Sequence, residues 1–505
     1  KIVNEELLKV NMLICTSLVD MYARCHALAR AQRVFDCLLF HGIVIWTALI
    51  GGYAENGYGE EALKRFEQMQ HEGVLPNAIA YICILKACCR IGALEKGKRV
   101  HAQVSGVNLH DKNTILGTTL VDMYAKCGAL GKAQEIFDEL EIHNVITWNV
   151  LITGYAQKGH AEETLYCLEW MQLEGFLPNA ITFICTLKAC GILRAIDKGK
   201  EVHDHIARSG LLGKNVPLGN ALIDMYAKCG DLAKARQVLD DLPIRDVVSW
   251  NTLISGYAQK GQKALEAIKC YQKMRRDDLI PDGVTFICIM KACGSLGAIE
   301  MAVEVGKEIH DQIVKRGFLE KDISLGVALV DMYTKCGMLE SANQVFETLP
   351  DPTIVTWTTL ITGYAQLGQI ENALWVLESM IGEGIEPNAV TFVSVLNACS
   401  HAGFVEMGQA IFEVMMNYHG IKPTFEHHTC IIDLFGRAGQ LDNAVRFTMD
   451  KPFHPNIAMW LDMLGACRKS GNVEFGEKAF MHAFLFDENE SAAYVCLSNM
   501  YAEAG

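Results

Sequence analysis

The alternation of apolar and polar residues between 145 and 179 predicts two consecutive helices. From 147 to 157, apolar side chains recur at helical spacing: Trp148, Leu151, Ile152 and Tyr155. Gly159 then interrupts the pattern and can end the first helix, because glycine adopts the left-handed conformation of a C-cap. A second segment, 161–173, again places its apolar residues on one face. Pro178 disfavours helix before it, so this stretch is predicted to be one helical hairpin.

The same hairpin pattern recurs along the chain with a long period. Its tryptophans are separated by 102, 102, 107 and 103 residues: Trp46, Trp148, Trp250, Trp357 and Trp460. Each period divides into units of 35, 36 and 31 residues, and the longer period adds one residue within 247–282 and four within 283–322. We expect these insertions in a turn or in a second helix. Because one hairpin cannot bury its apolar face alone, we predict an all-α solenoid of stacked helix-turn-helix repeats.

The recurring Trp, Tyr, Met and Cys residues fall on the apolar helix faces, so we assign them to the core. The 19 cysteines include no C-x-x-C pair, and the adjacent Cys88 and Cys89 cannot both face one metal from a helix. We therefore expect no metal site and no other cofactor. Most thiols should be small buried apolar groups in a reducing compartment.

The formal net charge is -14. Indiscriminate binding to phosphates requires clustered Lys and Arg, so the acidity argues against it, although not against recognition of bases. The longest apolar stretch, Leu38 to Ala54, is too short and interrupted to span a bilayer, and we expect no membrane association. Because the chain opens at Lys1 and stops at Gly505 within an expected helix, we expect both ends to continue. The absence of a targeting segment therefore gives no destination.

No phrase in the sequence predicts a catalytic centre. The segment His160-Ala161-Glu162 matches the H-x-E of zinc deaminases, but its P-C-x-x-C partner is absent and His160 falls in a predicted turn. The adjacent His427 and His428 should diverge on a helix, and we expect an exposed pair. Phosphate-binding loops and nucleophile motifs are also absent. We therefore expect a non-enzymatic chain without a small-molecule substrate.

Two polar positions interrupt the apolar pattern of the units. The fifth residue of most 35- and 31-residue units is Thr or Asn: Thr16, Thr47, Thr118, Asn149, Asn220, Asn251, Thr358 and Thr429. The last residue is mostly Asn or Asp: Asn77, Asn144, Asn179, Asp246, Asp282, Asn388 and Asn456. Stacking should align both rows along one face. Helix capping explains the last position equally well, but it does not predict a polar row at the fifth position, inside a helix.

These units resemble the pentatricopeptide repeats of the plant PLS subclass over nearly the whole chain. The phrases VVSWNTLISGYAQKG from Val247, VTFICIMKACGSLGA from Val284 and GNALIDMYAKCGDLAKARQV from Gly219 resemble its P, L and S variants. The S-like units are 12–42, 114–144, 216–246, 323–353 and 425–456; the P-like units are 43–77, 145–179, 247–282 and 354–388; the L-like units are 78–113, 180–215, 283–322 and 389–424. Residues 1–11 end a preceding degenerate repeat, thirteen repeats span 12–456, residues 457–490 resemble the family's first E motif, and 491–505 resemble a truncated second one.

The resemblance implies a right-handed superhelix that binds single-stranded RNA with one base per repeat. In the family, the fifth and last residues of a repeat select the base, with Thr favouring purines and Asn favouring pyrimidines at the fifth position. A last Asn can donate to adenine or cytosine, whereas an acceptor-only Asp suits uracil or guanine. Small apolar second residues should sandwich the bases: Val44, Ile146, Val248 and Val355.

Applied to this chain, the pairs suggest the sequence 5′-nAnAYnUUnnAnA-3′. The L-like units carry an aliphatic fifth residue and should contribute weakly: Ile82, Ile184, Ile287 and Val393. The units 12–42 and 323–353 lack the usual pair, because Thr16 is matched with Gly42 and Val327 with Thr353.

PLS arrays that end in E motifs resemble the specificity factors of organellar C-to-U RNA editing. The resemblance thus implies a mitochondrial or plastid protein whose deaminase is a following DYW domain or a separate partner. Two alternatives stay open. A protein-binding scaffold of the tetratricopeptide kind fits the acidity but not the unequal unit lengths. A role in organellar RNA splicing or stabilisation is not distinguished from editing by the sequence.

Overall fold

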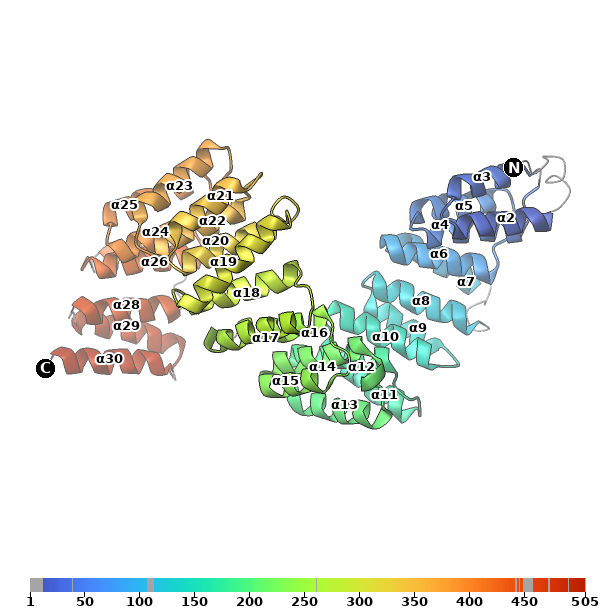
Figure 1. Cartoon of the computed structure of the whole chain (residues 1–505), viewed down its shortest axis with the longest axis horizontal. Coiled ribbons are helices and arrows are strands. Elements are labelled where there is room, and N and C mark those ends of the chain that lie inside the picture. Colours follow the sequence, from blue (N-terminus) through green and yellow to red (C-terminus); the bar gives the residue numbers. More distant parts are fainter. Residues whose placement is uncertain are drawn as a thin grey trace. The chain divides into compact units, whose positions relative to one another are not determined.

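The computed structural model describes residues 12–38, 40–106, 113–259, 261–440, 443–444, 446–447, 457–470, 473–488 and 490–504, and every regular element in these ranges is a helix (Figure 1). The chain divides into two units, Lys1–Leu253 and Ile254–Gly505. The first contains α2 (Met12–Arg24), α3 (Leu28–Asp36), α4 (Ile43–Glu55), α5 (Gly59–His71), α6 (Ala78–Ile91), α7 (Leu94–Gly106), α8 (Thr114–Lys126), α9 (Leu130–Glu139), α10 (Val145–Lys158), α11 (Ala161–Leu173), α12 (Ala180–Leu193), α13 (Ile196–Ser209), the 3-10 turn η1 (Leu212–Lys214), α14 (Val216–Cys229) and α15 (Leu232–Asp241).

The division between the two units falls inside α16 (Val247–Ala258). The second unit then contains η2 (Gly261–Lys263), α17 (Ala264–Arg276), α18 (Gly283–Leu296), α19 (Glu300–Lys315), α20 (Ile323–Lys335), α21 (Leu339–Thr348), α22 (Ile354–Gln366), α23 (Ile370–Gly382), α24 (Ala389–Ala402), α25 (Val405–Asn417), α26 (Phe425–Arg437), α28 (Ile457–Ser470), α29 (Val473–Phe486) and α30 (Ser491–Ala504).

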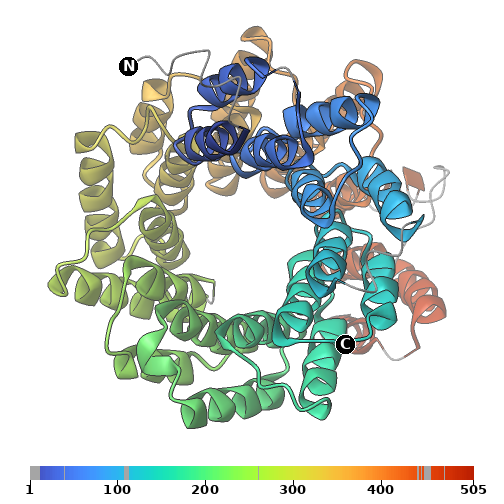
Figure 2. The same cartoon turned by 90° about the vertical axis from the view of Figure 1, so that its right-hand side faces the viewer.

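Within each unit, the helices form hairpins that stack in chain order. The first helix of a hairpin packs against its own second helix and against the first helix of the next hairpin, as α8 packs on α9 and α10, and α22 on α23 and α24. In Figure 2, the first helices of the first unit, blue to green, form one layer and the second helices form another. This arrangement confirms the predicted α-solenoid of helix-turn-helix repeats.

The hairpin at 145–179 shows how the sequence sets the helix ends. Asn144 caps the start of α10, and Gly159 follows its last residue with a φ of 84°. In the turn, the His160 amide donates to the Tyr155 carbonyl oxygen over 3.0 Å. Glycine adopts this left-handed conformation without a steric penalty from Cβ. The helix bounds expected from the sequence are therefore confirmed to within a few residues.

A second glycine allows neighbouring hairpins to approach closely. A Cβ added at Gly154 of α10 would lie 2.6 Å from the Cβ of Ala125 on α8. The same packing recurs at Gly52, where an added Cβ would lie 2.5 Å from the Cβ of Ala23. Small residues at these crossings bring the first helices together, so the polar positions of successive repeats come within hydrogen-bonding reach.

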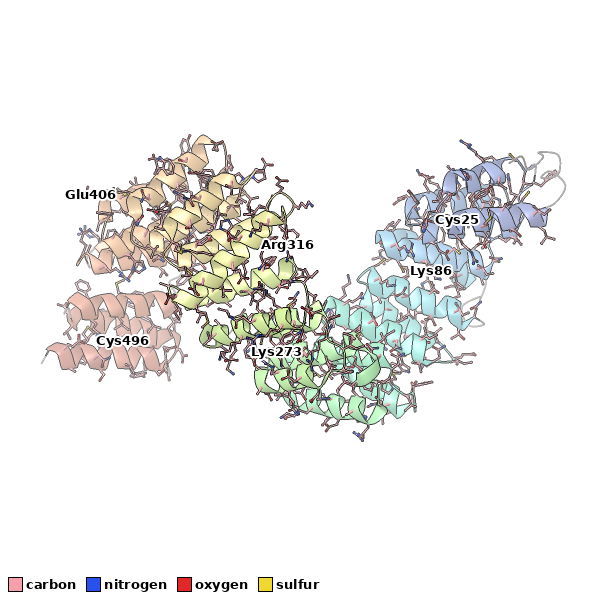
Figure 3. The ribbon with its side chains drawn as sticks, in the orientation of Figure 1. Cys25, Lys86, Lys273, Arg316, Glu406 and Cys496 are labelled. Atoms are coloured by element: carbon pink, nitrogen blue, oxygen red, sulfur yellow. The ribbon has the colours of Figure 1, made fainter. Side chains whose placement is uncertain are left out.

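The recurring aromatic and sulfur-containing residues form the core, as expected. Trp46 and Trp250 are fully buried, and so is the repeated cysteine represented by Cys88. Burial, together with the neighbouring Cys127, raises the pKa of the Cys88 thiol to about 11. Ten of the 19 cysteines are buried, which agrees with the expectation for most of them, whereas Cys25 (Figure 3) and Cys37 are exposed.

Both insertions of the longer period lie where the sequence suggested. The extra residue of 247–282 falls beside the short turn η2, which precedes α17. The four extra residues of 283–322 are accommodated around α19, which has 16 residues where the equivalent α13 has 14. Among the described helices, none has the length and apolar character required to cross a bilayer.

Candidate nucleic-acid interface

The last residue of a unit caps the first helix of the next unit. Its side-chain Oδ1 accepts a hydrogen bond from a backbone amide two or three residues later. Asn77 accepts from the Ala80 amide over 2.8 Å, Asn144 from the Thr147 amide over 2.9 Å, and Asp246 from the Ser249 amide over 2.7 Å. The same cap is formed by Asn179, Asp282 and Asn388, whereas Asn456 lies outside the described residues. The capping alternative raised by the sequence is thus confirmed for the six described positions.

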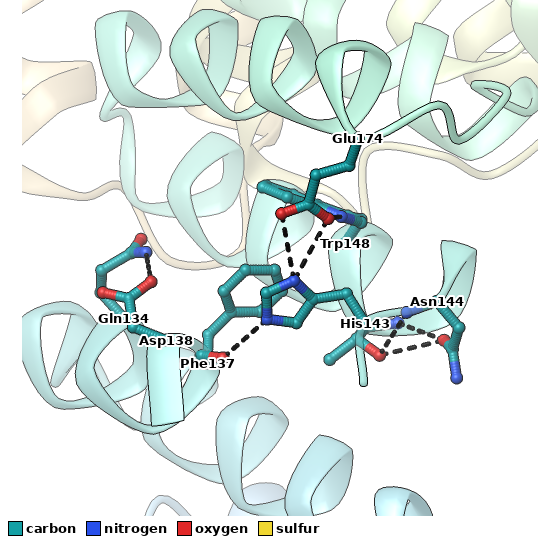
Figure 4. A network of polar contacts seen from close by, with 8 residues as sticks. Gln134, Phe137, Asp138, His143, Asn144, Trp148 and Glu174 are labelled. Carbon is teal, nitrogen blue, oxygen red and sulfur yellow. Dashed lines mark hydrogen bonds and ion pairs between the residues drawn. The ribbon is translucent and has the colours of Figure 1, made fainter. Parts of the chain in front are cut away.

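Capping uses one end of the side chain and leaves the other end available. In Asn144 and Asn179, the cap engages Oδ1, while Nδ2 has no hydrogen-bond partner among the described residues. Figure 4 shows the Asn144 amide nitrogen turned away from the bonds of the cap. An Asn cap therefore presents a donor, whereas an Asp cap has only acceptor oxygens. Capping and base recognition are compatible functions of one residue.

The third residue of the next first helix completes five of these six caps, Ala80 after Asn77 being the exception, and the sequence analysis did not single it out. The Thr182 hydroxyl accepts from the Asn179 amide over 3.1 Å, and the Ser249 hydroxyl accepts from the Asp246 amide over 3.2 Å. Equivalent residues that are also fully buried are Thr147, Thr285 and Thr391. The signal was present in the sequence as a recurring Asn/Asp-x-x-Thr/Ser spacing, which is a capping-box pattern.

The third residue also bonds to the fifth residue of the preceding unit. The Thr182 hydroxyl donates to Asn149 Oδ1 over 2.6 Å, and the Ser249 hydroxyl donates to Asn220 Oδ1 over 2.6 Å. In the second unit, the hydroxyls of Thr358 and Thr391 are 2.9 Å apart. Each hydroxyl thus connects the fifth and the last residue of one repeat. The structure brings together three predicted pairs: Asn149 with Asn179, Asn220 with Asp246, and Thr358 with Asn388.

Asp246 shows how this connection affects charge. Its Oδ1 accepts from the Ser249 amide and, over 3.3 Å, from Asn220 Nδ2, and it lies 2.7 Å from the Ser249 hydroxyl oxygen, whose one proton it shares with Asn220 Oδ1. Burial by itself raises the pKa of the Asp246 carboxyl, but these hydrogen bonds outweigh it and lower the pKa below its ordinary value. Asp246 is therefore an anionic acceptor at neutral pH.

At other units, the fifth residue is placed differently or has other contacts. The hydroxyls of Thr47 and Thr118 donate over 2.7 Å to the carbonyl oxygens four residues earlier in their own helices. The Thr429 hydroxyl is buried without a partner in the described part of the chain. Thr16 is half-buried on α2, and Asn251 is buried on α16, while Asp282 caps α18.

The predicted base-sandwiching residues are exposed, although they are aliphatic. Val44, Ile146, Val248 and Val355 have exposed fractions of 55–67%. The structure extends this row to the second residues of other units: Leu13, Ile79, Ile115, Ile181, Val284 and Val390. Because these side chains are exposed to solvent and are not buried in the core, packing of the solenoid does not explain why aliphatic residues recur there.

In the second unit, these positions line one hollow of about 320 Å³. The aliphatic Val355 and Val390, the second residues of consecutive units, line it together with Thr358 and Asn388. Lys335 also lines it and is paired with Asp331 over 2.7 Å. The hollow thus combines two valines, four threonines, the side-chain amides of Gln366 and Asn388, and the ion pair of Lys335 with Asp331. That set suits a flat heterocyclic base carrying a phosphate.

The paired histidines differ from the expectation, because both are buried. His427 is the third residue of α26 and takes the role that Thr or Ser has elsewhere: its Nδ1 accepts from the Thr424 amide over 3.1 Å. Its Nε2 donates to the Ala389 carbonyl oxygen over 2.9 Å, and His428 contacts the Thr424 carbonyl oxygen. Burial lowers the pKa of His427. The burial of His427 follows from its position in the cap of α26, which the two adjacent histidines in the sequence do not indicate by themselves.

His160 lies in the turn before α11, as predicted, with about half of its side chain exposed. The described residues hold no cluster of three or more His, Cys, Asp or Glu side chains placed to bind a metal ion.

Comparison with known proteins identifies the repeats. A profile described as the PPR repeat family matches residues 41–90, 143–191, 245–295 and 352–401. A second profile, described as the PPR repeat, matches residues 118–145, 220–247 and 390–418. These matches show PPR repeats between residues 41 and 418.

Similar proteins of Arabidopsis thaliana carry the same repeats. A mitochondrial pentatricopeptide repeat-containing protein is 33% identical over 495 residues, which cover 97% of this chain and 70% of that protein. A chloroplastic one is 35% identical over 497 residues, covering 98% of this chain and 60% of that protein. The chain thus spans between 60% and 70% of the length of these two relatives.

Solved structures share the fold. The pentatricopeptide repeat protein PPR10 from maize superposes with a TM-score of 0.58 at 18% identity, over 97% of this chain and 81% of PPR10. A structure of PPR10 in complex with an 18-nt psaJ RNA element gives a TM-score of 0.51 at 18% identity, over 96% of this chain and 71% of that one.

Proposed function

The chain belongs to the pentatricopeptide repeat family, and on this premise we propose that it binds single-stranded RNA in a sequence-specific manner. One base lies at each P-like and S-like unit, between the second residues of that unit and of the next. The fifth and last residues of the unit contact its Watson–Crick edge.

The observation that carries this proposal is the hollow at Val355, Thr358, Asn388 and Val390. A base is flat, with two apolar faces and a polar edge, and single-stranded RNA is recognised through unstacked bases of this kind. Val355 and Val390 supply contacts for the faces, whereas Thr358 and Asn388 supply a hydroxyl and an amide for the edge. In a protein of net charge -14, Lys335 lines this hollow as a cation that can exchange its partner Asp331 for the phosphate.

The hydrogen bonds at the repeat boundaries support a base preference set by the last residue. Asn144 and Asn179 present an amide donor, which suits the bare ring nitrogen of adenine or cytosine. Asp246 presents a carboxylate, which suits the ring N–H of uracil or guanine. The aliphatic fifth residues of the L-like units, such as Ile184, offer no polar atom to a base and leave those positions weakly specified.

We infer further that the chain acts in organelles as the specificity factor for C-to-U RNA editing. The alternation of 35-, 36- and 31-residue units matches the PLS pattern, and the relatives include proteins named as mitochondrial and as chloroplastic. The hairpin of α28 and α29, with α30, corresponds to the E motifs and offers a surface for an editing deaminase. The array itself supplies binding and no catalysis.

A fluorescence-anisotropy titration at two salt concentrations tests RNA binding. One RNA carries AnAYnUUnnAnA, and in the other each specified A becomes C and each specified U becomes G. We expect binding at least tenfold tighter to the first RNA, with a shallow dependence on salt because few phosphates are contacted. Equal binding to the two RNAs would contradict the base assignments, and no binding to either would contradict the proposed function.

A further inference from the structure

A second hollow, of about 590 Å³, lies in the first unit between α9, α10 and α11. Five aromatic side chains line it: Phe137, Trp148, Tyr155, Tyr166 and Trp170. Three carboxylates line it as well: Asp138, Glu163 and Glu174. The rings of Tyr166 and Trp170 are 59% and 46% exposed, so the hollow is accessible from solvent. None of the fifth, last or second residues assigned to RNA lines it.

The carboxylates of this hollow have no lysine or arginine partner among the described residues. Glu174 accepts from Trp148 Nε1 over 3.0 Å and faces His143 Nδ1 at 3.2 Å (Figure 4). Asp138 accepts from the side-chain amide of Gln134 over 2.7 Å. Glu163 contacts His160 at 3.3 Å. Acidic groups beside aromatic faces form a favourable environment for a cation.

Each period of three units can be called a triplet. The preceding triplet, 102 residues earlier in the chain, supplies its own cation at the position equivalent to this hollow. Arg65 stands there at the position of Cys167. Burial raises the pKa of the Tyr53 hydroxyl. The charge of Arg65 and its hydrogen bond to Tyr53 oppose this rise in pKa, whereas the charges of Glu61 and Asp36 add to it. In the Arg65 side chain, Nη1 also donates to Gln68 Oε1 over 2.9 Å. A guanidinium thus occupies the first-triplet counterpart of the hollow.

The following triplet places an arginine against the carboxylate that is equivalent to Asp138. Arg236 stands at the position of Gln134 and pairs with Asp240, the counterpart of Asp138, over 3.2 Å. The second triplet has Gln134 and Cys167 at these two positions, so neither of the two arginines has a counterpart there. There, burial and the charges of Cys167, Glu163 and Asp138 all raise the pKa of Tyr155, to about 12.

We propose that this hollow binds an arginine side chain presented by a partner protein. The planar guanidinium stacks on the exposed rings of Tyr166 and Trp170 and is neutralised by Asp138 and Glu163, at the place that the side chain of Arg65 takes in the first triplet. A polypeptide is the source that fits, because Leu173 and Leu177, which follow Trp170 along the chain, are 80% and 83% exposed and add apolar contacts for residues that flank the arginine. The site goes beyond RNA binding and is a place for protein assembly on the second helices.

The test uses the full chain labelled with 5-fluorotryptophan and the peptide Ac-Gly-Arg-Gly-NH2. The Trp170 signal, assigned with Trp170→Phe, is followed by fluorine NMR during titration. The twin peptide carries citrulline, which has nearly the shape of arginine but no charge. We expect a saturable shift with the arginine peptide and at least tenfold weaker binding of the citrulline peptide. Absence of a shift, or equal binding of the two peptides, overturns the proposal.

Two variants separate the site from a general charge effect. Cys167→Arg recreates Arg65 in the second triplet and should weaken peptide binding at least tenfold, while Gln172→Arg adds the same charge on an exposed face of α11 and should leave binding unchanged. Circular dichroism checks that each variant is folded. Should Cys167→Arg not fold, Tyr166→Ala removes an exposed ring and should weaken binding at least threefold. Undiminished binding in the folded variant overturns the proposal.

Discussion

The hydroxyl of Thr182 donates a 2.6 Å hydrogen bond to Oδ1 of Asn149, a residue of the preceding repeat. The same hydroxyl accepts from the amide of Asn179. One buried threonine therefore fixes the positions of both residues that are proposed to select a base. Base selection and the stacking of neighbouring repeats depend on the same contact.

Thr182→Val should weaken this repeat boundary, because it removes the hydroxyl and leaves Asn149 Oδ1 unpaired. We expect a loss of about 1–2 kcal/mol in the local stability of α12, together with weaker discrimination at the base bound by 145–179. Hydrogen exchange of the α12 amides measures the first effect. Thr186→Val is the matched control, since that fully buried hydroxyl donates to the Thr182 carbonyl oxygen in its own helix and has no other partner in the described ranges. Equal losses in discrimination for the two variants would contradict the role of Thr182.

The pair at 354–388 should be convertible from one base to another. Thr358→Asn combined with Asn388→Asp reproduces the pair Asn220 and Asp246, so we expect the preference at this position to change from adenine to uracil by about tenfold, or roughly 1.4 kcal/mol. Anisotropy titrations with RNAs that differ only at this base measure the change. Replacing the base opposite the L-like unit 389–424 serves as the control and should have little effect in either protein. An unchanged preference for adenine would refute the assignment.

Val355→Ser should weaken RNA binding without destabilising the fold. The side chain is 56% exposed, so we expect a change in unfolding free energy within about 0.5 kcal/mol and a two- to tenfold loss of affinity, or about 0.4–1.4 kcal/mol. Val414→Ser is the control, because Val414 is 45% exposed on the second helix α25. If the two variants bind RNA equally well, the aliphatic row does not contact bases.

His427→Thr should reduce the sensitivity of the fold to acid. Burial lowers the pKa of His427 in the folded chain, whereas the unfolded chain has the ordinary value of about 6.5. As pH falls through that value, the unfolded state takes up a proton that the folded state does not, so stability decreases until the lower folded pKa is reached. Thermal unfolding at pH 7.5 and 5.5 should show a smaller difference in Tm for the variant.

Any cavity that the shorter threonine leaves affects both pH values and cancels in this difference. The control is His401→Thr, which replaces an exposed histidine of α24 and should keep the wild-type pH difference. A full wild-type difference in the His427 variant would mean that other groups cause the acid sensitivity.

The sequence by itself determined the local structure of this protein. Helical spacing of residues such as Trp148 and Leu151, with Gly159 at the turn, set the hairpins, because these signals act within a few residues. The repeat of 102 residues then implied that the hairpins stack. Comparing equivalent positions of the units showed the aliphatic second residues and the polar fifth and last residues. The interaction of Asn144 with its own helix was also predictable, since capping is local.

Only the tertiary structure decided which of these residues meet. Thr182 and Asn149 are 33 residues apart, and their bond exists because first helices pack closely at small residues such as Gly154. The same holds for the burial of His427. It also holds for the contrast between Arg65 on α5 and Cys167 on α11, because the tertiary structure decides which side chains surround each of them. Contacts between repeats depend on how helices stack, and that geometry is set by the packing of whole helix faces.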